Sequence, residues 1–282
     1  MSRDAVTWDT ASRDAVNPAL RIAAQAARSA FQEALAAHTR EALAEYVADG
    51  ADGTPTMLID QLVEPAILAA LEQAGPLGRV NVVSEEAGFV DRGAAVTLVM
   101  DPVDGSANAA AGVPLCAFSA AVAVDGAFTE ALTVWLDTGR SWWAARGAPT
   151  PLRTSGRREL DGAAVSLLRP RTDLPHAWAA WRAVAGRAGR IRILSSSCLE
   201  AALVAEGATD AFADAASDTH RLVDLAAAVV LAEAAGGAVR DVHGRPIEPG
   251  TDLTLRWSGV VAATPELADE LAATLRAAAA GG

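Results

Sequence analysis

The sequence predicts a protein of the mixed α/β (α+β) class. Residues 18–48 are rich in alanine and place apolar side chains at helical spacing. Residues 80–145 consist instead of short apolar runs separated by turn residues, which is typical of strands. From about residue 163 onward, strand-like and helix-like segments alternate. This order favours helices packed on sheets over an all-helical or an all-strand protein.

The chain is long enough for one large domain or two closely joined lobes. It has 282 residues, of which 51% are hydrophobic and 21% charged, a balance typical of globular proteins. A stretch near residue 150 that contains glycine and proline gives a soft boundary. We expect an N-terminal α+β lobe over residues 1–150 and a C-terminal α/β lobe over residues 151–282, packed as one rigid body.

The first part of the chain contains sequence patterns that predict two helices. Asn17 as N-cap and Pro18 in the first turn predict a helix that runs to about residue 48, where two Asp-Gly pairs follow. A second helix is expected from near Thr56, and Pro65 is expected to kink or divide it.

The remaining elements follow from apolar runs and turn residues. Strands are predicted at residues 80–84, 95–100, 118–124, 131–136, 141–145, 163–168 and 191–194. Tight turns such as Asp125-Gly126 favour antiparallel pairing among the earlier strands. Helices are predicted around Trp178, from near Ser196, over residues 221–235 and from Pro265.

The chain is acidic. It carries 35 Asp and Glu against 23 Lys and Arg, a formal net charge of -12 at pH 7. Such a surface repels nucleic-acid phosphates and anionic membranes, so we expect neither as a partner. It is compatible with divalent cations, which could carry a phosphorylated substrate.

Two cysteines and the N-terminus bear on the compartment. Cys116 and Cys198 lack paired metal spacing and are too few for a disulfide framework in a chain of this length. Residues 1–4 lead into polar sequence without an apolar leader, and no run reaches the ~18 apolar residues of a membrane helix. We therefore expect a cytoplasmic protein.

The most informative segment is residues 96–106, an apolar strand that ends in Asp101 and Asp104, followed by Gly105-Ser106. Buried carboxylates repel each other and desolvation adds to that cost, so a divalent cation is their natural partner. Gly105 and Ser106 can present backbone amides at a helix start, which suits phosphate. By itself, the segment is equally consistent with a turn-rich loop of solvated aspartates.

Further acids stand at two other places. Glu85 and Glu86 follow a predicted strand, and Asp224 lies near the start of an otherwise apolar helix. Taken singly, the pair favours a solvated strand end, and Asp224 could simply interact with the helix dipole. The combination of these acids is far more specific than any one of them.

In combination these segments resemble the inositol monophosphatase family. Its signatures are a Glu-Glu pair, an Asp-Pro-x-Asp-Gly-Thr/Ser element and an Asp-x-Ala-Ala helix that leads to Glu-Ala-Gly-Gly. The chain keeps this order over roughly residues 50–265 and ends the last element as Glu-Ala-Ala-Gly-Gly. The resemblance implies a layered αβαβα sandwich, a homodimer, and hydrolysis of a small phosphate monoester with magnesium.

The resemblance also implies a set of metal ligands. Glu85, Asp101 and the Val103 carbonyl would bind one magnesium, and Asp101, Asp104 and Asp224 would bind a second, with two or three ions in all. These ligands are hard oxygens, as magnesium prefers. Such ions would activate a water for direct in-line attack on phosphorus, without a phosphoenzyme.

Three residues are implied in catalysis, namely Asp60, Ser106 and Glu85. Asp60 closes a Thr-x-x-x-Asp element that begins at Thr56, and it would pair with the Ser106 hydroxyl to orient or deprotonate the attacking water. Ser106 replaces the commoner threonine but keeps the hydroxyl.

Substrate contacts are implied for Asp104, Gly105, Ser106, Ser196, Ser197, Asp214 and Asp224. Helix capping explains the two serines equally well, and Asp214 could be a surface acid, with Asp218 as a competing candidate. Arg192 and Arg221 could reach a second anionic group, although surface salt bridges are the simpler interpretation.

Two departures from the family pattern leave the substrate open. The aromatic residue usual after Asn108 is absent, and Val223 stands where a tryptophan commonly precedes the helix aspartate. The pocket or the activity could therefore differ from that of typical inositol-phosphate enzymes. The candidate substrates are an inositol or sugar phosphate, fructose 1,6-bisphosphate, histidinol phosphate and adenosine 3′,5′-bisphosphate.

Two other classes fit the segment less well. Haloacid dehalogenase-like phosphatases form an aspartyl-phosphate and separate their two acids by one residue, whereas two residues separate Asp101 from Asp104. An EF-hand needs alternating acids and a closing glutamate, which the segment lacks. A homologue that binds metal or ligand with weak catalysis remains an alternative.

Overall fold

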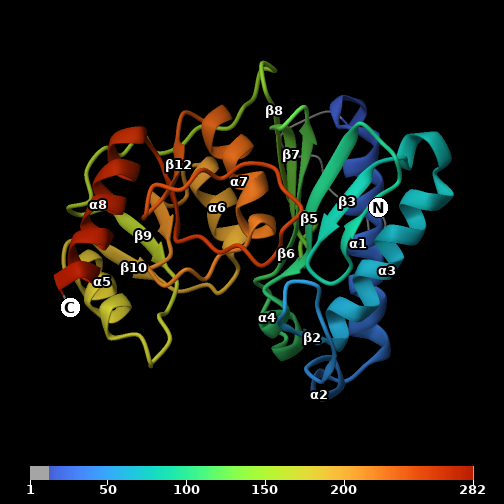
Figure 1. Ribbon diagram of the computed structural model, residues 1–282, viewed down its shortest axis with the longest axis horizontal. Helices are drawn as coiled ribbons and strands as arrows, with labels where there is room; N and C mark the ends of the chain where they lie inside the picture. Colours follow the sequence, from blue (N-terminus) through green and yellow to red (C-terminus); the bar gives the residue numbers. More distant parts are fainter. Residues whose placement is uncertain (1–12, 282) are drawn as a thin grey trace.

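The computed structural model describes residues 13–281 and shows five layers (Figure 1). Helices α1 (Pro18–Ala37) and α3 (Leu58–Gln73) cover one face of a six-stranded sheet. Helices α6 (Ser197–Ala205) and α7 (Leu222–Ala234) lie between this sheet and a five-stranded one. Helices α5 (Pro175–Ala185) and α8 (Pro265–Gly281) pack beyond the second sheet. This αβαβα arrangement confirms the predicted fold class.

The remaining helices are short: η1 (Arg13–Ala15), α2 (Arg40–Leu43), η2 (Gly75–Gly78) and α4 (Ser106–Ala111). The strands are β1 (Tyr46–Asp49), β2 (Pro55–Met57), β3 (Asn81–Ser84), β4 (Gly88–Val90), β5 (Val96–Asp104), β6 (Ala117–Val124), β7 (Ala127–Trp135), β8 (Ser141–Ala145), β9 (Ala164–Leu167), β10 (Arg190–Arg192), β11 (Ala211–Ala213), β12 (Ala238–Asp241) and β13 (Gly259–Ala262).

Both large sheets are mixed. The six-stranded sheet has the order β4-β3-β5-β6-β7-β8, in which only β3 and β5 are parallel. The five-stranded sheet has the order β10-β9-β11-β13-β12, with β10, β9 and β11 parallel and the other pairs antiparallel. Because β3 and β5 are parallel neighbours, the residues that follow them meet at one edge of the first sheet.

Helix α7 is apolar on all sides because it is enclosed on all sides. Every residue from 222 to 232 is buried, and the helix packs against strands of both sheets. A helix of this kind belongs in the interior. Asp224 is the one acid in this buried stretch, so its carboxylate needs a partner of positive charge or hydrogen-bond donors.

Helix α1 ends earlier than predicted. It stops at Ala37, and Thr39 caps the separate helix α2, its hydroxyl accepting a hydrogen bond from the Ala42 amide at 3.3 Å. Residues 46–49 then form β1, an exposed strand that pairs with β2. The prediction of one helix to residue 48 was wrong because the capping residue Thr39 starts a new helix.

Helix α3 runs unbroken through Pro65, so its predicted division was wrong. One face of the helix is completely buried, with Ile59, Val63, Ile67 and Leu71 at 0% exposure. Burial of four such side chains contributes roughly 1.5–3 kcal/mol each. That sum exceeds the cost of about 3 kcal/mol for a proline inside a helix.

The strands that the sequence did not predict are all short. They are β1, β2, β4, β11, β12 and β13, each of three or four residues. Alternation over so few residues is hard to distinguish from a loop.

The two-lobe division near residue 150 stays a prediction. The strands of the first large sheet lie at residues 81–145 and those of the second at residues 164–262. Residues 1–4, which carry the prediction about a leader, lie outside the described residues. No helix within residues 13–281 is both long and apolar enough to cross a membrane.

Candidate functional site

An irregularity at the end of β5 brings Asp101 and Asp104 to one face of the sheet. Side chains alternate along a strand, so residues three apart normally point to opposite faces. Asp101 pairs with Ser119 and Asp104 with Ala117, however, so β5 contains one extra residue at this point. The Val103 amide inside this bulge donates a hydrogen bond to the Asp101 carboxylate at 3.1 Å. Both acids are buried.

Glu85 and Asp224 reach the same centre from two other elements. Glu85 follows β3, the parallel neighbour of β5, and therefore lies beside the end of β5. Asp224 lies in the first turn of α7. The pKa of Asp101 is raised well above its ordinary value, first by burial and then by the charges of Glu85, Asp104 and Asp224. The four predicted acids thus form one electrostatic cluster.

The acid cluster is short of positive charge. Burial raises the pKa of Glu85 to about 8, with the Arg221 guanidinium opposing the rise and Asp224 adding to it. Burial likewise raises the pKa of Asp104 to about 6, against the hydrogen bond from Ser196. A divalent cation among these oxygens would favour the ionised forms. The donor set, buried and made of hard oxygens, fits magnesium.

A thiol lies at the inner side of the cluster. The Cys198 sulfur and carboxylate oxygens of Asp101 and Asp104 lie within 4.8 Å of one another. Burial raises the pKa of this thiol well above its ordinary value, and the neighbouring acids raise it further. Magnesium prefers hard oxygen ligands to sulfur, which favours the carboxylate oxygens as its ligands.

Asp104 is also tied to the N-terminus of α6. Its carboxylate accepts hydrogen bonds from the backbone amides of Ser197 and Cys198, both at 2.9 Å, and from the Ser196 hydroxyl. The Ser196 side chain makes no capping bond to the helix. Helix capping is therefore the wrong interpretation of Ser196, which instead holds a site carboxylate.

Asp60 and Ser106 form a pair beside the cluster. The Ser106 oxygen lies 2.7 Å from the Asp60 carboxylate and 2.9 Å from the Val103 carbonyl oxygen. Burial raises the pKa of Asp60 to about 7, although the hydrogen bond from Ser106 opposes the rise. A carboxyl with a pKa near neutrality can take up and release a proton at the pH of a cell.

Arg221 lies inside the acid cluster and not on the surface. Its guanidinium pairs with Asp52 at 2.5 Å, with Asp224 at 3.4 Å and with Glu85, and its side chain is 19% exposed. The prediction of a surface salt bridge for Arg221 was wrong, because its partners Asp52 and Asp224 are buried and its partner Glu85 is half-buried. A second arginine, Arg256, donates to the Asp52 carbonyl oxygen at 3.0 Å.

A cavity of about 360 Å³ opens at the acid cluster. It is lined by Tyr46, Thr54, Pro55, Met57, Asp60, Glu85, Ser106, Thr219, Arg221 and Arg256. Tyr46 belongs to β1, so the strand that was predicted to be helical supplies part of the wall. The cavity is large enough for a small phosphorylated metabolite.

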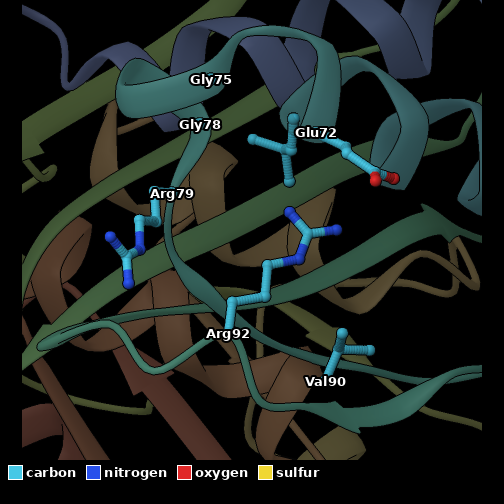
Figure 2. Close-up of a pocket in the computed structure, with 7 residues that line it drawn as sticks. Glu72, Gly75, Gly78, Arg79, Val90 and Arg92 are labelled. Atoms are coloured by element: carbon cyan, nitrogen blue, oxygen red, sulfur yellow. The ribbon is translucent and has the colours of Figure 1, made fainter.

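A larger cavity, of about 530 Å³, lies elsewhere, between the end of α3, η2 and β4 (Figure 2). Figure 2 shows Arg92 reaching toward the end of α3, where it donates to the Leu68 carbonyl oxygen at 3.3 Å. Glu72 is the single acid in its lining and is exposed. Without paired carboxylates, this cavity does not share the chemistry of the acid cluster.

Asp214 is bound by its own loop, and Asp218 is bound by Arg245 and Ser258 from another segment. Asp214 is completely buried and accepts a hydrogen bond from the Ser217 amide at 2.6 Å, so the surface-acid interpretation was wrong. Asp218 pairs with Arg245 at 2.6 Å. Neither acid lines the cavity at the cluster. Arg192 is half-buried and forms no ion pair within residues 13–281, so its predicted surface salt bridge is not found there.

Two supporting acids were missed by the sequence analysis. Glu64 accepts a hydrogen bond from the Ala87 amide at 2.8 Å and so holds the turn after Glu85 and Glu86. Glu200 accepts hydrogen bonds from the backbone amides at positions 194 and 196, at 3.2 and 3.4 Å. The available signal was an acid inside an otherwise apolar helix, the same pattern that drew attention to Asp224.

Comparisons with known proteins find relatives of this sequence and of this fold. A sequence model described as the inositol monophosphatase family matches residues 12–280. A fructose-1,6-bisphosphatase/inositol-1-monophosphatase from Methanothermobacter thermautotrophicus is 33% identical over 82% of this chain and 87% of its own. The Nus factor SuhB of Pseudomonas aeruginosa is 31% identical over 81% of this chain and 87% of its own. The crystal structure of extragenic suppressor protein suhB from Bartonella henselae shares the fold, with a TM-score of 0.75, 23% identity and coverage of 90% of this chain and 95% of that one.

Proposed function

The chain belongs to the inositol monophosphatase family, and from this premise we propose that it hydrolyses a small phosphate monoester to an alcohol and phosphate with magnesium as cofactor. One observation carries the proposal: a buried cluster of acids lies beside the Asp60–Ser106 pair at the wall of a cavity of about 360 Å³. A relative that is 33% identical is named as a phosphatase.

We propose that Glu85, Asp101, Asp104, Asp224 and the carbonyl oxygen of Val103 hold two or three magnesium ions. Support comes from the oxygen chemistry of the set and from the raised pKa values of Glu85, Asp101 and Asp104, which mark a need for positive charge. When bound, such ions would neutralise phosphoryl oxygens and lower the pKa of a water molecule.

Asp60 and Ser106 orient the attacking water in this proposal. Glu85 is the third residue proposed to act in catalysis, as a ligand of the metal. The Ser106 hydroxyl has one proton and two acceptors in reach, the Asp60 carboxylate and the Val103 carbonyl oxygen. An ionised Asp60 accepts that proton and leaves lone pairs on the Ser106 oxygen for a hydrogen bond from water. Direct attack by this water forms a bond from its oxygen to phosphorus and breaks the bond from phosphorus to the alcohol oxygen, without a phosphoenzyme. The proton that the water loses would pass by way of Ser106 to Asp60, and the leaving oxygen would take up a proton from solvent.

We further propose that the substrate contacts Asp104, Gly105, Ser106, Ser196, Ser197, Asp214 and Asp224. The two serines are supported by their hydrogen bonds to Asp104. Asp214 has the weakest support, because hydrogen bonds from its own loop occupy its carboxylate. We expect an inositol or sugar phosphate as substrate, with fructose 1,6-bisphosphate, histidinol phosphate and adenosine 3′,5′-bisphosphate as the alternatives.

A phosphate-release screen over these compounds tests the proposal. The purified protein is assayed with magnesium and, in parallel, with EDTA. We expect magnesium-dependent release from at least one compound. If magnesium raises the melting temperature but no compound releases phosphate, the chain is a metal-binding homologue without this activity.

We propose a cytoplasmic homodimer as the working form. The compartment is supported by the two buried cysteines, which form no disulfide, and the dimer by the family resemblance. A small phosphorylated substrate is the expected partner, and neither nucleic acid nor membrane is expected for a chain with a net charge of -12. Light scattering coupled to size-exclusion chromatography measures the oligomeric state.

A further inference from the structure

Arg221 contacts two of the acids that are proposed to bind metal ions. Its guanidinium contacts carboxylate oxygens of Glu85 and Asp224, two of the four acids proposed above as magnesium ligands. A guanidinium this close to both carboxylates repels a divalent cation that approaches the same oxygens, because two positive groups a few ångströms apart raise each other's free energy. Arg221 and a metal ion therefore compete for these oxygens.

The competition is strengthened by burial. The side chains of Glu85 and Asp224 are 19% and 7% exposed, and that of Arg221 is 19% exposed, so water screens the charges only weakly. Within residues 13–281, Arg221 is the one basic side chain that forms an ion pair with either acid. Removing it would leave buried negative charges without compensation, which destabilises a fold strongly.

The guanidinium of Arg221 also pairs with an acid that is not a proposed metal ligand. Asp52, between β1 and β2, binds Arg221 at 2.5 Å, and its side chain is 0% exposed. Asp52 is not among the proposed metal ligands. Arg256 also lies next to Asp52, with one nitrogen 3.8 Å from the Asp52 carboxylate and 3.0 Å from its carbonyl oxygen. Arg221 can therefore release Glu85 and Asp224 and still keep a buried partner.

We propose that Arg221 is a built-in counter-ion, which neutralises Glu85 and Asp224 in the metal-free protein and yields them to divalent cations while it stays paired with Asp52. The inference rests on the proposed function and extends it to the control of metal affinity. It makes Arg221 a positioning residue whose removal tightens metal binding, whereas a residue that merely orients Glu85 as a ligand would weaken binding when removed.

The test is metal binding by calorimetry, with Mn2+ as the probe, on the wild-type protein and two single variants. Arg221→Met should bind Mn2+ on the order of tenfold more tightly, an ordinary size for coupling between two binding events. Asp52→Asn should bind it more weakly than wild type, because Arg221 then has only Glu85 and Asp224 as partners. The double variant should match Arg221→Met, since Asp52 acts only through Arg221.

Thermal unfolding adds a readout that is independent of turnover. In EDTA, Arg221→Met should have a lower melting temperature than wild type. Saturating Mn2+ should reduce this difference in melting temperature, because the ion supplies the missing positive charge. Arg256→Met is the matched control, because it removes a neighbouring arginine without freeing Glu85 or Asp224. Its affinity for Mn2+ should stay within about threefold of wild type, a difference below 1 kcal/mol.

Two outcomes overturn the inference. One is unchanged or weaker Mn2+ binding by Arg221→Met, and the other is an effect of Asp52→Asn that persists in the double variant. If Arg221→Met does not fold, Arg221→Lys is tested instead. Lysine keeps the positive charge but cannot contact Glu85 and Asp224 at once as a guanidinium does, so this variant should bind Mn2+ more tightly than wild type. Failure of wild type to bind Mn2+ or Mg2+ at all would instead refute the proposed function.

Discussion

The Ser106 hydroxyl lies 2.7 Å from the Asp60 carboxylate, although 46 positions separate the two residues in the chain. Asp60 comes from the first turn of α3 and Ser106 from the start of α4, directly after the bulge that contains Asp101 and Asp104. This pair links the helical layer on the outer face of the first sheet to the acid cluster at the sheet edge.

We predict that Asp60→Asn lowers the turnover number at least a hundredfold while Mg2+ binding changes little. The amide cannot accept the proton of Ser106 in the way a carboxylate does, and loss of a general base typically costs 10²–10⁴-fold. Phosphate release under saturating substrate and magnesium measures the effect.

A pair of Ser106 variants separates the hydroxyl from the rest of the side chain. Ser106→Ala should lose activity to a similar extent as Asp60→Asn, whereas Ser106→Thr, which keeps the hydroxyl, should retain most of it. Equal activity of the alanine and threonine variants would contradict a role for the hydroxyl in orienting the water.

We predict that Asp104→Asn lowers activity at least a hundredfold and also loosens the start of α6. Its carboxylate accepts hydrogen bonds from two backbone amides and the Ser196 hydroxyl, and it is one of the proposed metal ligands. Phosphate release across a magnesium titration measures the first effect, and amide hydrogen exchange at residues 197–199 measures the second.

Asp218→Asn provides the control for that variant. Asp218 is an acid of the same type, but its side chain is 43% exposed and pairs with Arg245 away from the cluster. Its replacement should leave the magnesium dependence unchanged. Near-normal turnover by Asp104→Asn would discredit the proposed site.

We predict that Glu200→Gln changes the free energy of unfolding by less than about 1 kcal/mol at low pH, because the protonated carboxyl and the amide each present one oxygen and one hydrogen-bearing group to the two backbone amides. Burial raises the pKa of Glu200 in the folded protein to about 7, against 4.5 for the ordinary value. The folded state thus holds a proton that the unfolded state releases, so the stability that Glu200 contributes falls as pH rises from about 4.5 to about 7.

Wild type should therefore lose free energy of unfolding relative to Glu200→Gln as pH rises across that range. Urea denaturation in EDTA at several pH values measures it. Glu233→Gln, at a side chain that is 52% exposed near the end of α7, is the control and should show no such trend. A constant difference would mean that Glu200 is ionised in the folded protein at all of these pH values.

We predict that Arg245→Met lowers the free energy of unfolding by about 1 kcal/mol at neutral pH, or roughly 2–4 °C in melting temperature. Arg245 joins Asp218 and Asp241, at 2.6 and 2.7 Å. Burial alone would raise the pKa of both acids, but the hydrogen bonds from Arg245 and Ser258 and the charge of Arg245 together outweigh it and lower both.

The stability from these two acids is present above their unfolded pKa values and is lost as pH falls through the lowered ones. The difference in the free energy of unfolding between wild type and Arg245→Met should therefore disappear at acidic pH. Arg171→Met is the matched control, since Arg171 pairs with Asp173 while 74% exposed, and its melting temperature should equal that of wild type. A difference in the free energy of unfolding that grows as pH falls would contradict a stabilising pairing of Arg245 with ionised Asp218 and Asp241.

The layered fold was predictable where the signals are local and long. The strand of residues 141–145 matches its prediction, and the ends of α7 differ from theirs by one residue each. The short strands and the end of α1 were not predictable, because three or four residues show no clear period and because Thr39 outweighs the helical pattern around it.

Sequence by itself determined which residues are proposed to carry the chemistry. The acids at positions 85, 101, 104 and 224, with Asp60 and Ser106, were singled out because their short motifs, taken together and in this order, resemble the signatures of one family. Tertiary structure alone decided that the bulge in β5 turns Asp101 and Asp104 to one face, and that Arg221 meets Asp52 across 169 positions. Charged residues follow no periodic pattern in the sequence. Which residue pairs with which depends on the fold, because charges interact strongly only when they lie within a few ångströms of each other and are weakly screened.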